Sequence, residues 1–299
     1  MSDDMTRVVL PTGIELEVLD TGPRDAETLV FLHGFPENHR TWRHQIAHFS
    51  GRYRCIAPNQ RGYAGSSNPQ EASEYTIEKL MGDVEHMADA LGVGKFTLVG
   101  HDLGGVVAWA MALTGAMKDR IKRLVIANAP HPFILSSLLY LNQHQRAASQ
   151  YIRHFRDREN DAMIREHGLL QLLVKALDFE GAASMEDAER KLLLKEWANP
   201  DTAMAMINWY RAGLAEVPPM DAPYELPADY SLPPLPNVAI PTLIVWGMND
   251  VALPVANLDG LDALVDDLTL EKVEGSGHFV TWEAPDKFNA ALETFLTAR

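Results

Sequence analysis

The segment Val99–Gly105 reads Val-Gly-His-Asp-Leu-Gly-Gly and lies between an apolar run, Lys95–Val99, and a helical pattern that starts at Gly104. It has the form Gly-x-nucleophile-x-Gly, in which the central residue, here Asp102, occupies a tight, strained turn that tolerates only small neighbours. Backbone N–H groups at the start of the following helix can bind developing negative charge. A plain strand-to-helix turn with an aspartate N-cap has a similar sequence. The turn alone leaves both interpretations open.

Outward from this turn, the chain alternates strand and helix patterns. A helix is predicted from Ile77 to Leu91, where apolar residues recur at spacings of three and four, and Gly92 is its expected stop. Alternation of this kind indicates a mostly parallel sheet with helices on both faces. The strand patterns in this part of the chain cover residues 14–20, 28–32, 54–57, 95–99 and 121–127.

The middle of the chain has a different pattern. Residues 131–214 show helical patterns and no convincing strand, and residues 217–241 are dense in proline, which indicates an extended connection. Strand patterns return at 242–246 and 268–273, and a last helix is expected to begin near Pro285. We therefore predict an α/β core of about eight strands. The core is formed by residues 1–130 and 219–299, and a helical cap, residues 131–218, interrupts it.

Three further motifs follow predicted strands. His33-Gly34-Phe35-Pro36 follows an early strand, and Asp250 and His278 follow the two late strands. Ligands collect at the strand ends of open parallel sheets. The chain order Asp102, Asp250, His278 matches the nucleophile, acid and histidine of the α/β-hydrolase arrangement. The sequence resembles the α/β-hydrolase fold over nearly its whole length, and the insertion matches the helical cap typical of that fold.

Aspartate at the nucleophile position changes the expected chemistry. A carboxylate is a poor nucleophile for an ester or amide carbonyl, but it attacks saturated carbon and gives an alkyl ester. Water must then attack the carbonyl of that ester, with a histidine as general base. Asp102 therefore favours epoxide opening or dehalogenation. It argues against an ordinary esterase, lipase or protease.

Two dehalogenase families resemble parts of the chain. Haloalkane dehalogenases usually have a Trp directly after the nucleophile, where this chain has Leu103. Fluoroacetate dehalogenases resemble the segment Tyr210–Gly213 and the HGFP loop. However, they carry arginines near the nucleophile, where Leu103 and Val106 stand here. They also place the triad acid after the earlier strand, at the position of Asn128.

Epoxide hydrolases match better. Residues 33–37, 41–45 and 128–132 are similar to their first loop, the segment after it and the start of their cap. Tyr151 and Tyr210 match their early and late cap tyrosines, with Tyr140 as a rival for the early position. Two phenol O–H donors can polarise the ring oxygen and supply a proton. Tyrosines in helices more commonly serve as core or rim aromatics, which is the alternative interpretation.

The resemblance implies an epoxide hydrolase in which Asp102 attacks carbon and His278, oriented by Asp250, activates water. It also implies that the cap tyrosines hold the ring oxygen, and that Leu103 in place of the family's usual Trp changes the pocket wall. The rivals are a haloalkane or haloacid dehalogenase with the same triad and a catalytically silent small-molecule-binding protein. The oxyanion hole is expected from the N–H groups of Phe35 and Leu103, and the substrate pocket from His33, Pro36, Trp42, His101 and Phe279.

Composition restricts the partners. The chain has 299 residues, 26 Lys and Arg against 41 Asp and Glu, and a net charge of −15, which argues against binding to nucleic acid or anionic lipid. Cys55 is the single cysteine, so no internal disulfide is possible. The acidic N-terminus does not resemble a signal peptide, and no apolar run approaches the roughly 18 residues that span a bilayer.

We therefore expect a cytoplasmic monomer or homodimer that acts on an apolar epoxide with water and needs no cofactor. No metal site is expected, because His33, His39 and His44 lack a Cys or carboxylate to complete a ligand set.

Overall fold

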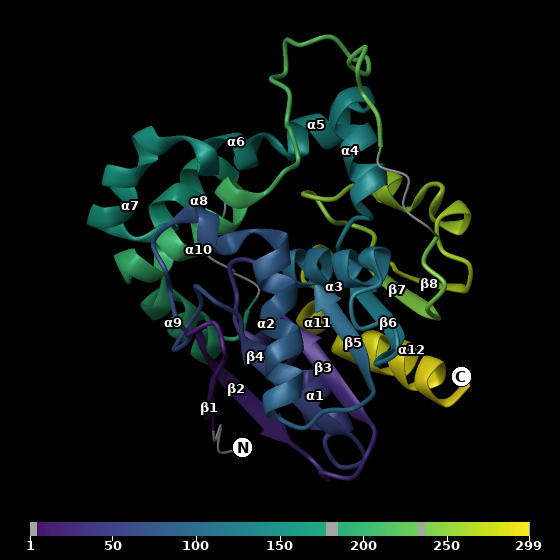
Figure 1. Cartoon of the computed structure of the whole chain (residues 1–299). Helices are drawn as coiled ribbons and strands as arrows, with labels where there is room; N and C mark the ends of the chain where they lie inside the picture. Colours follow the sequence, from purple (N-terminus) through teal and green to yellow (C-terminus); the bar gives the residue numbers. More distant parts are fainter. Residues whose placement is uncertain (1–4, 178–184, 233–236, 299) are drawn as a thin grey trace.

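The computed structural model of the chain describes residues 5–177, 185–232 and 237–298. Eight strands form one sheet in the order β1-β2-β4-β3-β5-β6-β7-β8 (Figure 1). β2 is antiparallel to its neighbours β1 and β4, and from β4 to β8 all pairs are parallel. The predicted mostly parallel sheet is therefore confirmed. The strands are β1 (Met5–Val9), β2 (Glu15–Thr21), β3 (Thr28–Leu32), β4 (Arg54–Asn59), β5 (Phe96–His101), β6 (Ile121–Ala127), β7 (Thr242–Gly247) and β8 (Leu268–Val273).

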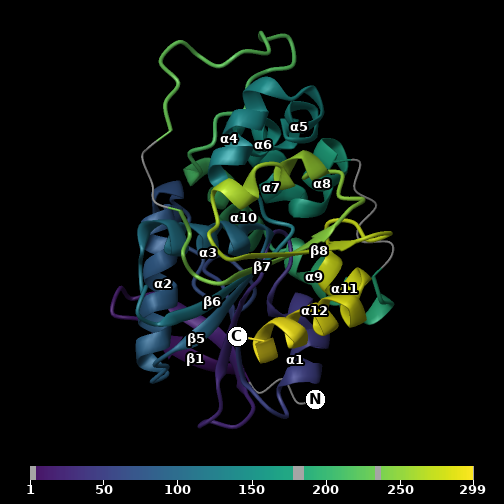
Figure 2. The same cartoon turned by 90° about the vertical axis from the view of Figure 1, so that its right-hand side faces the viewer.

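Helices cover both faces of the sheet. Successive side chains of a strand point to opposite faces, so in β3 Val30 packs into one core cluster and Phe31 into the other. α2 (Ile77–Ala90) and α3 (Asp102–Thr114) cover the first face, and α1 (Arg43–Phe49) and α12 (Pro285–Ala298) cover the second. Figure 2 shows α2 on one side of the strands and α1 and α12 on the other. The short helix α11 (Val280–Glu283) precedes α12.

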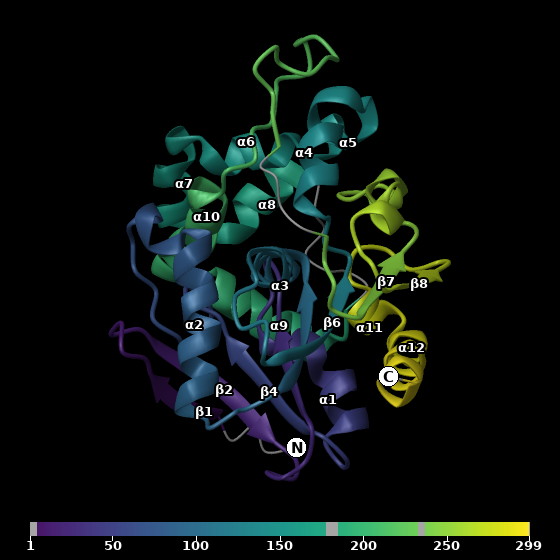
Figure 3. The same ribbon diagram turned by 45° about the vertical axis from the view of Figure 1, so that its right-hand side comes forward.

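Among the described residues between β6 and β7 there are seven α-helices, and most of them stand over one end of the sheet (Figures 1 and 3). The proline-dense segment after them runs as an extended loop, of which residues 233–236 lie outside the described ranges. The seven helices are α4 (Pro132–Leu141), α5 (Gln143–Ala148), α6 (Gln150–Arg156), α7 (Asp161–His167), α8 (Leu169–Leu177), α9 (Asp187–Trp197) and α10 (Pro200–Ala212).

Two features differ from the expectation. β1 was not predicted, because it is a short edge strand in which only Val8 is buried. The helical pattern across 163–177 is divided into α7 and α8 by Gly168, whose φ of 72° ends the first helix. Within the described ranges, no helix is both long and apolar enough to cross a membrane.

Candidate active site

The turn between β5 and α3 holds Asp102 in an unusual backbone conformation. Asp102 has a φ of 49°, in the left-handed region that side-chain-bearing residues rarely adopt. Its neighbours must be small, because a Cβ atom at Gly104 would lie 2.3 Å from the carbonyl oxygen of Leu32. A Cβ atom at Gly100 would lie 2.6 Å from the carbonyl oxygen of Gly104. This tight packing explains why both positions are occupied by glycine. Because the turn follows β5, the Asp102 carboxylate lies at the carboxyl ends of the parallel strands.

The loop after β3 provides a hydrogen bond to this carboxylate. The backbone N–H of Phe35 donates to Asp102 Oδ1 at 2.7 Å. The loop is held by His33, whose Nε2 accepts from the backbone N–H of Gln60 at 3.0 Å, while the Gln60 side chain donates to the His33 carbonyl at 2.6 Å. From the cap, the indole N–H of Trp197 donates to the Pro36 carbonyl at 2.7 Å.

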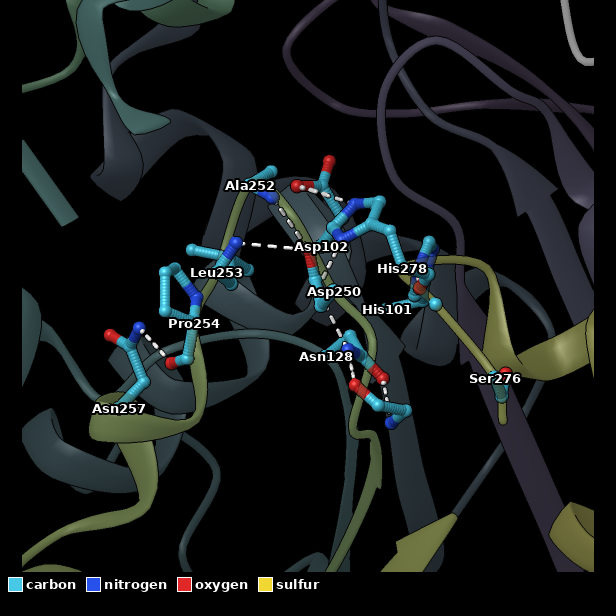
Figure 4. Close-up of polar contacts among 12 residues, drawn as sticks. His101, Asp102, Asn128, Asp250, Ala252, Leu253, Pro254, Asn257, Ser276 and His278 are labelled. Atoms are coloured by element: carbon cyan, nitrogen blue, oxygen red, sulfur yellow. Dashed lines mark hydrogen bonds and ion pairs between the residues drawn. The ribbon is translucent and has the colours of Figure 1, made fainter. Parts of the chain in front are cut away.

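His278 lies between two carboxylates. Its Nδ1 is 2.7 Å from Asp250 Oδ2, and its Nε2 is 3.5 Å from Asp102 Oδ2 (Figure 4). Asp102, Asp250 and His278 are at least 28 positions apart in the chain, and the fold brings them together in one row of charged groups. Asp102 presents Oδ1 to the Phe35 N–H and Oδ2 to the imidazole.

Asp250 is held by four donors. Its Oδ1 accepts from the backbone N–H groups of Ala252 and Leu253, each at 2.9 Å. Its Oδ2 accepts from His278 and from Asn128 Nδ2, the latter at 2.7 Å. Asn128 also accepts from the backbone N–H of Gly247 at 2.8 Å, so it ties the end of β6 to the end of β7. Apart from the place of Asn128 directly after a strand, nothing in the sequence indicates this contact.

The charges of the three groups support one another. Burial alone would raise the pKa of Asp102 and of Asp250, but His278 outweighs burial and lowers both. Burial alone would lower the pKa of His278, but the two carboxylates outweigh it and hold that pKa well above its ordinary value. The ion pairs therefore favour the ionised form of both aspartates and the protonated form of the imidazole.

His101 contacts the backbone of His278. Its Nε2 is 2.9 Å from the carbonyl oxygen of His278, which makes Nε2 the donor, and burial lowers the pKa of His101 to about 4. Burial also lowers the pKa of His33 to about 3. Trp42 is fully buried against Phe31 and Phe288, in the core cluster on the second face of the sheet. These placements give His33, Trp42 and His101 packing and bonding contacts, and their role as pocket residues stays a prediction.

The other predicted pocket and oxyanion residues lie close to the triad. The ring of Phe279 is 5.0 Å from that of His278. Pro36 follows Phe35 through a cis peptide bond. Leu103 is partly buried and packs against the core. The contribution of its N–H to an oxyanion hole stays a prediction.

The two cap tyrosines meet near the triad. The ring centroids of Tyr151 in α6 and Tyr210 in α10 are 5.9 Å apart, edge to face. Tyr210 also meets the ring of Phe35 at 5.0 Å, so it packs on the residue whose N–H contacts Asp102. Burial and the nearby Asp102 charge raise the pKa of both phenols, which therefore stay protonated donors. Tyr140 instead donates to Glu216 Oε2 at 2.9 Å.

No group of three or more His, Cys, Asp or Glu side chains in the described ranges is arranged to hold a metal ion. The chemistry that the geometry supports is carried by a buried carboxylate, an imidazole beside it, a backbone donor and two phenols.

The chain is similar to known proteins of one family. The family model for the alpha/beta hydrolase fold matches residues 27–285. A solved structure described under "Novel epoxide hydrolases belonging to the alpha/beta hydrolases superfamily in metagenomes from hot environments" is 56% identical, covers 99% of each chain and has a TM-score of 0.96. The Bacillus megaterium epoxide hydrolase structure, solved with an inhibitor, is 25% identical over 98% of this chain and 100% of its own, with a TM-score of 0.83.

Among curated proteins, Epoxide hydrolase 1 of Caenorhabditis elegans is 29% identical over 302 residues, which cover 97% of this chain and 70% of that protein. The fold, the full-length match and the agreement among these relatives point the same way. The chain belongs to the alpha/beta hydrolase fold family and, within it, to the epoxide hydrolases.

Proposed function

We propose that this epoxide hydrolase converts apolar epoxides to vicinal diols through a covalent ester on Asp102. The observation that carries the proposal is the position of the Asp102 carboxylate, with Oδ1 on the Phe35 N–H and Oδ2 facing His278. One oxygen is thus placed as the future carbonyl oxygen of an ester, and the other as the attacking atom. We further propose that residues 131–218 form the cap that covers this site.

In the first step, Asp102 Oδ2 attacks the less hindered epoxide carbon, and the bond between that carbon and the ring oxygen breaks. The ring oxygen takes the electron pair and a proton from Tyr151 or Tyr210, and the phenolate that remains later receives, through water, the proton that His278 releases. Buried phenols suit this role because burial raises their pKa and keeps the proton in place until an alkoxide develops. The product of the step is an alkyl ester of Asp102 that carries a neighbouring hydroxyl group.

The ester changes the state of the base. Its formation neutralises Asp102, and this removes one of the two carboxylates that raise the pKa of His278. The imidazole can then release its proton and accept one from water, while Asp250 keeps it oriented. The first step thereby prepares the second.

In the second step, the activated water attacks the carbonyl carbon of the ester. Negative charge develops on Oδ1, where the Phe35 N–H lies, and a donor of this kind contributes about 3 to 4 kcal/mol in comparable sites. On collapse of the tetrahedral intermediate the bond between the carbonyl carbon and the substrate oxygen breaks, and this oxygen takes from His278 the proton that came from water. The diol leaves, and Asp102 passes the proton of its new carboxyl group to His278 and becomes a carboxylate again. One oxygen of the restored carboxylate comes from water.

The test follows that oxygen. Enzyme in excess over styrene oxide is allowed one turnover in heavy-oxygen water, and the peptide that contains Asp102 is weighed. We expect the label in Asp102, and in the diol only after a later turnover. His278→Gln serves as the control, because it should hold the ester and leave Asp102 without label. Label in the diol after one turnover, with none in Asp102, would contradict the covalent route. Release of halide from haloacids or haloalkanes without diol formation would favour a dehalogenase.

A further inference from the structure

A buried polar network connects two parts of the site that are far apart in the chain. Glu37 follows the loop that carries the Phe35 N–H, and Trp282 lies four residues after His278. The indole N–H of Trp282 donates to Glu37 Oε1 at 2.9 Å, across 245 positions of sequence. The mechanism above uses neither side chain.

Three further contacts lie beside this one. The Thr41 hydroxyl donates to Glu37 Oε2 at 2.6 Å, and its oxygen lies 3.1 Å from the Thr281 hydroxyl oxygen. The Gln45 side chain donates to the Thr281 carbonyl at 2.9 Å. All of these side chains are at most 8% exposed. We call the five residues the polar seam: Glu37, Thr41, Gln45, Thr281 and Trp282.

On one side, the seam leads to the oxyanion donor. The backbone N–H of Glu37 donates to the Gly34 carbonyl at 3.1 Å and closes the turn that contains Phe35. The N–H of Phe35 then points at Asp102 Oδ1. A shift of Glu37 therefore shifts the donor that meets the charge of the tetrahedral intermediate.

On the other side, the seam leads to the base. The Trp282 ring stacks on that of Phe279, with centroids 5.2 Å apart and an interplanar angle of 19°. Phe279 in turn packs edge to face on His278, with centroids 5.0 Å apart. The position of the imidazole therefore depends on where Trp282 is held.

The chemistry of Glu37 fits a residue that orients others. Its donors are a neutral hydroxyl and a neutral indole, and burial raises its pKa to about 7. The nearby positive charges that oppose this rise are Arg43 and His278. Burying a carboxylate against neutral donors costs stability. In return, the two carboxylate oxygens of Glu37 accept from the Thr41 hydroxyl and the Trp282 indole. They hold both groups in place relative to the loop that carries the Phe35 N–H.

We propose that Glu37 is a positioning residue for hydrolysis of the Asp102 ester, because the seam sets the Phe35 N–H and His278 on opposite sides of the same carbonyl group. The inference rests on the proposed covalent route. Hydrolysis needs the backbone donor and the base together, whereas the first step depends on Asp102 and the cap tyrosines. Loosening the seam should therefore slow the second step more than the first.

Trp282→Phe tests this, because it removes the indole N–H and keeps a ring against Phe279. We expect kcat to fall about 10- to 100-fold, the loss typical of a small misplacement of reacting groups. KM should fall in parallel, and the ester should accumulate during turnover, as measured by intact-protein mass. Ester formation, measured by rapid quench, should stay within about threefold of wild type, because the seam does not touch the phenols.

Glu37→Ala should behave like Trp282→Phe, and Glu37→Gln should restore most of the hydrolysis rate, because its amide oxygen can still accept from Trp282. Trp109→Phe is the matched control. Its indole N–H is equally buried and donates to the Ala129 carbonyl at 3.1 Å, outside the seam. We expect it to lose stability without accumulating ester.

Hydrolysis at the wild-type rate in both Trp282→Phe and Glu37→Ala would overturn the positioning role. If either variant fails to fold, Thr41→Val gives the same test through the second oxygen of Glu37. Absence of ester in His278→Gln would instead overturn the covalent route itself. The two failures are therefore distinguishable.

Discussion

The two halves of the site are built in different ways. The core half consists of charged groups, Asp102, Asp250 and His278, held by hydrogen bonds of 2.7 to 2.9 Å from strand-end loops. The cap half consists of two neutral phenols whose rings pack on each other and on Phe35 and Phe155. The charged side chains thus follow the ends of strands, where the sheet holds the backbone in place. The cap supplies two phenol donors, which cost little free energy to bury because they are neutral.

The helices α9 and α10 are hydrogen-bonded to loops of the core. Glu196 in α9 accepts from the Asn38 side chain and from the backbone N–H of Ala64, both at 2.8 Å. In α10, the Trp209 indole donates to the Arg61 carbonyl at 3.0 Å, directly before Tyr210. Hydrogen bonds to the core therefore hold α10 at its position relative to the sheet. They thereby also determine the position of Tyr210, which belongs to α10.

The largest effect should come from the nucleophile. We expect Asp102→Ala to reduce diol formation at least about 10⁴-fold, because the covalent route is then closed and only binding and general electrostatics remain. Steady-state assays with styrene oxide measure this, and intact mass should show no adduct. Residual turnover above one hundredth of wild type would contradict a nucleophilic role.

His278→Gln should come next. We expect turnover to fall about 10³- to 10⁴-fold, the range for loss of a general base, with one equivalent of ester formed per enzyme. The adduct distinguishes this core variant from the one above. A slow enzyme that holds no adduct would place the histidine in the first step.

The cap tyrosines should have a smaller effect of a different kind. Tyr210→Phe and Tyr151→Phe should each slow ester formation about 10- to 100-fold, because one of two proton donors is lost. No ester should accumulate, since the second step is untouched. Tyr140→Phe is the matched control, because its hydroxyl contacts Glu216, and it should keep wild-type rates. Accumulated ester in Tyr210→Phe or Tyr151→Phe would show that the cap tyrosines also act in the second step. The core and cap halves would then no longer differ in the step that they serve.

The prediction that bears least on activity concerns stability and pH. Burial lowers the pKa of His101 and of His131 to about 4 and that of His33 to about 3, below the ordinary value of 6.5. Between those values and pH 6.5 these three histidines bind more protons in the unfolded chain than in the folded one, and Glu37, whose pKa burial raises to about 7, opposes them in part. The free energy of unfolding should therefore fall as pH falls through this window, by up to about 1.4 kcal/mol per pH unit for each histidine.

His278 does not reverse this trend. Its pKa is raised, so its contribution is complete below pH 6.5 and is lost only as pH rises through its folded pKa. Urea unfolding at pH 7, 5.5 and 4.5 measures the slope. His131→Asn keeps an N-cap for α4 and removes one of the three histidines, so its slope should be smaller. An unchanged slope would show that this histidine does not titrate as described.

Much of the core could be predicted from the sequence, because its signals are local. The glycines beside Asp102 indicate that backbone segments approach closely there, and the strand patterns indicate alternating burial. The turn and the strands can therefore each be recognised from a few neighbouring residues. β1 escaped prediction because an edge strand buries too little to leave a pattern. The break between α7 and α8 at Gly168 was not predicted, because apolar residues keep a helical spacing on both sides of it.

The sequence by itself determined the chain order of Asp102, Asp250 and His278, the predicted nucleophile, acid and base, and the strand ends that they follow. Only the tertiary structure decided what surrounds them: Asn128 on Asp250, Gln60 on His33, Glu37 on Trp282, and Tyr210 on Phe35. The physical reason is that buried polar contacts must be satisfied across long stretches of chain, here up to 245 positions, and no local periodicity encodes which two segments will meet.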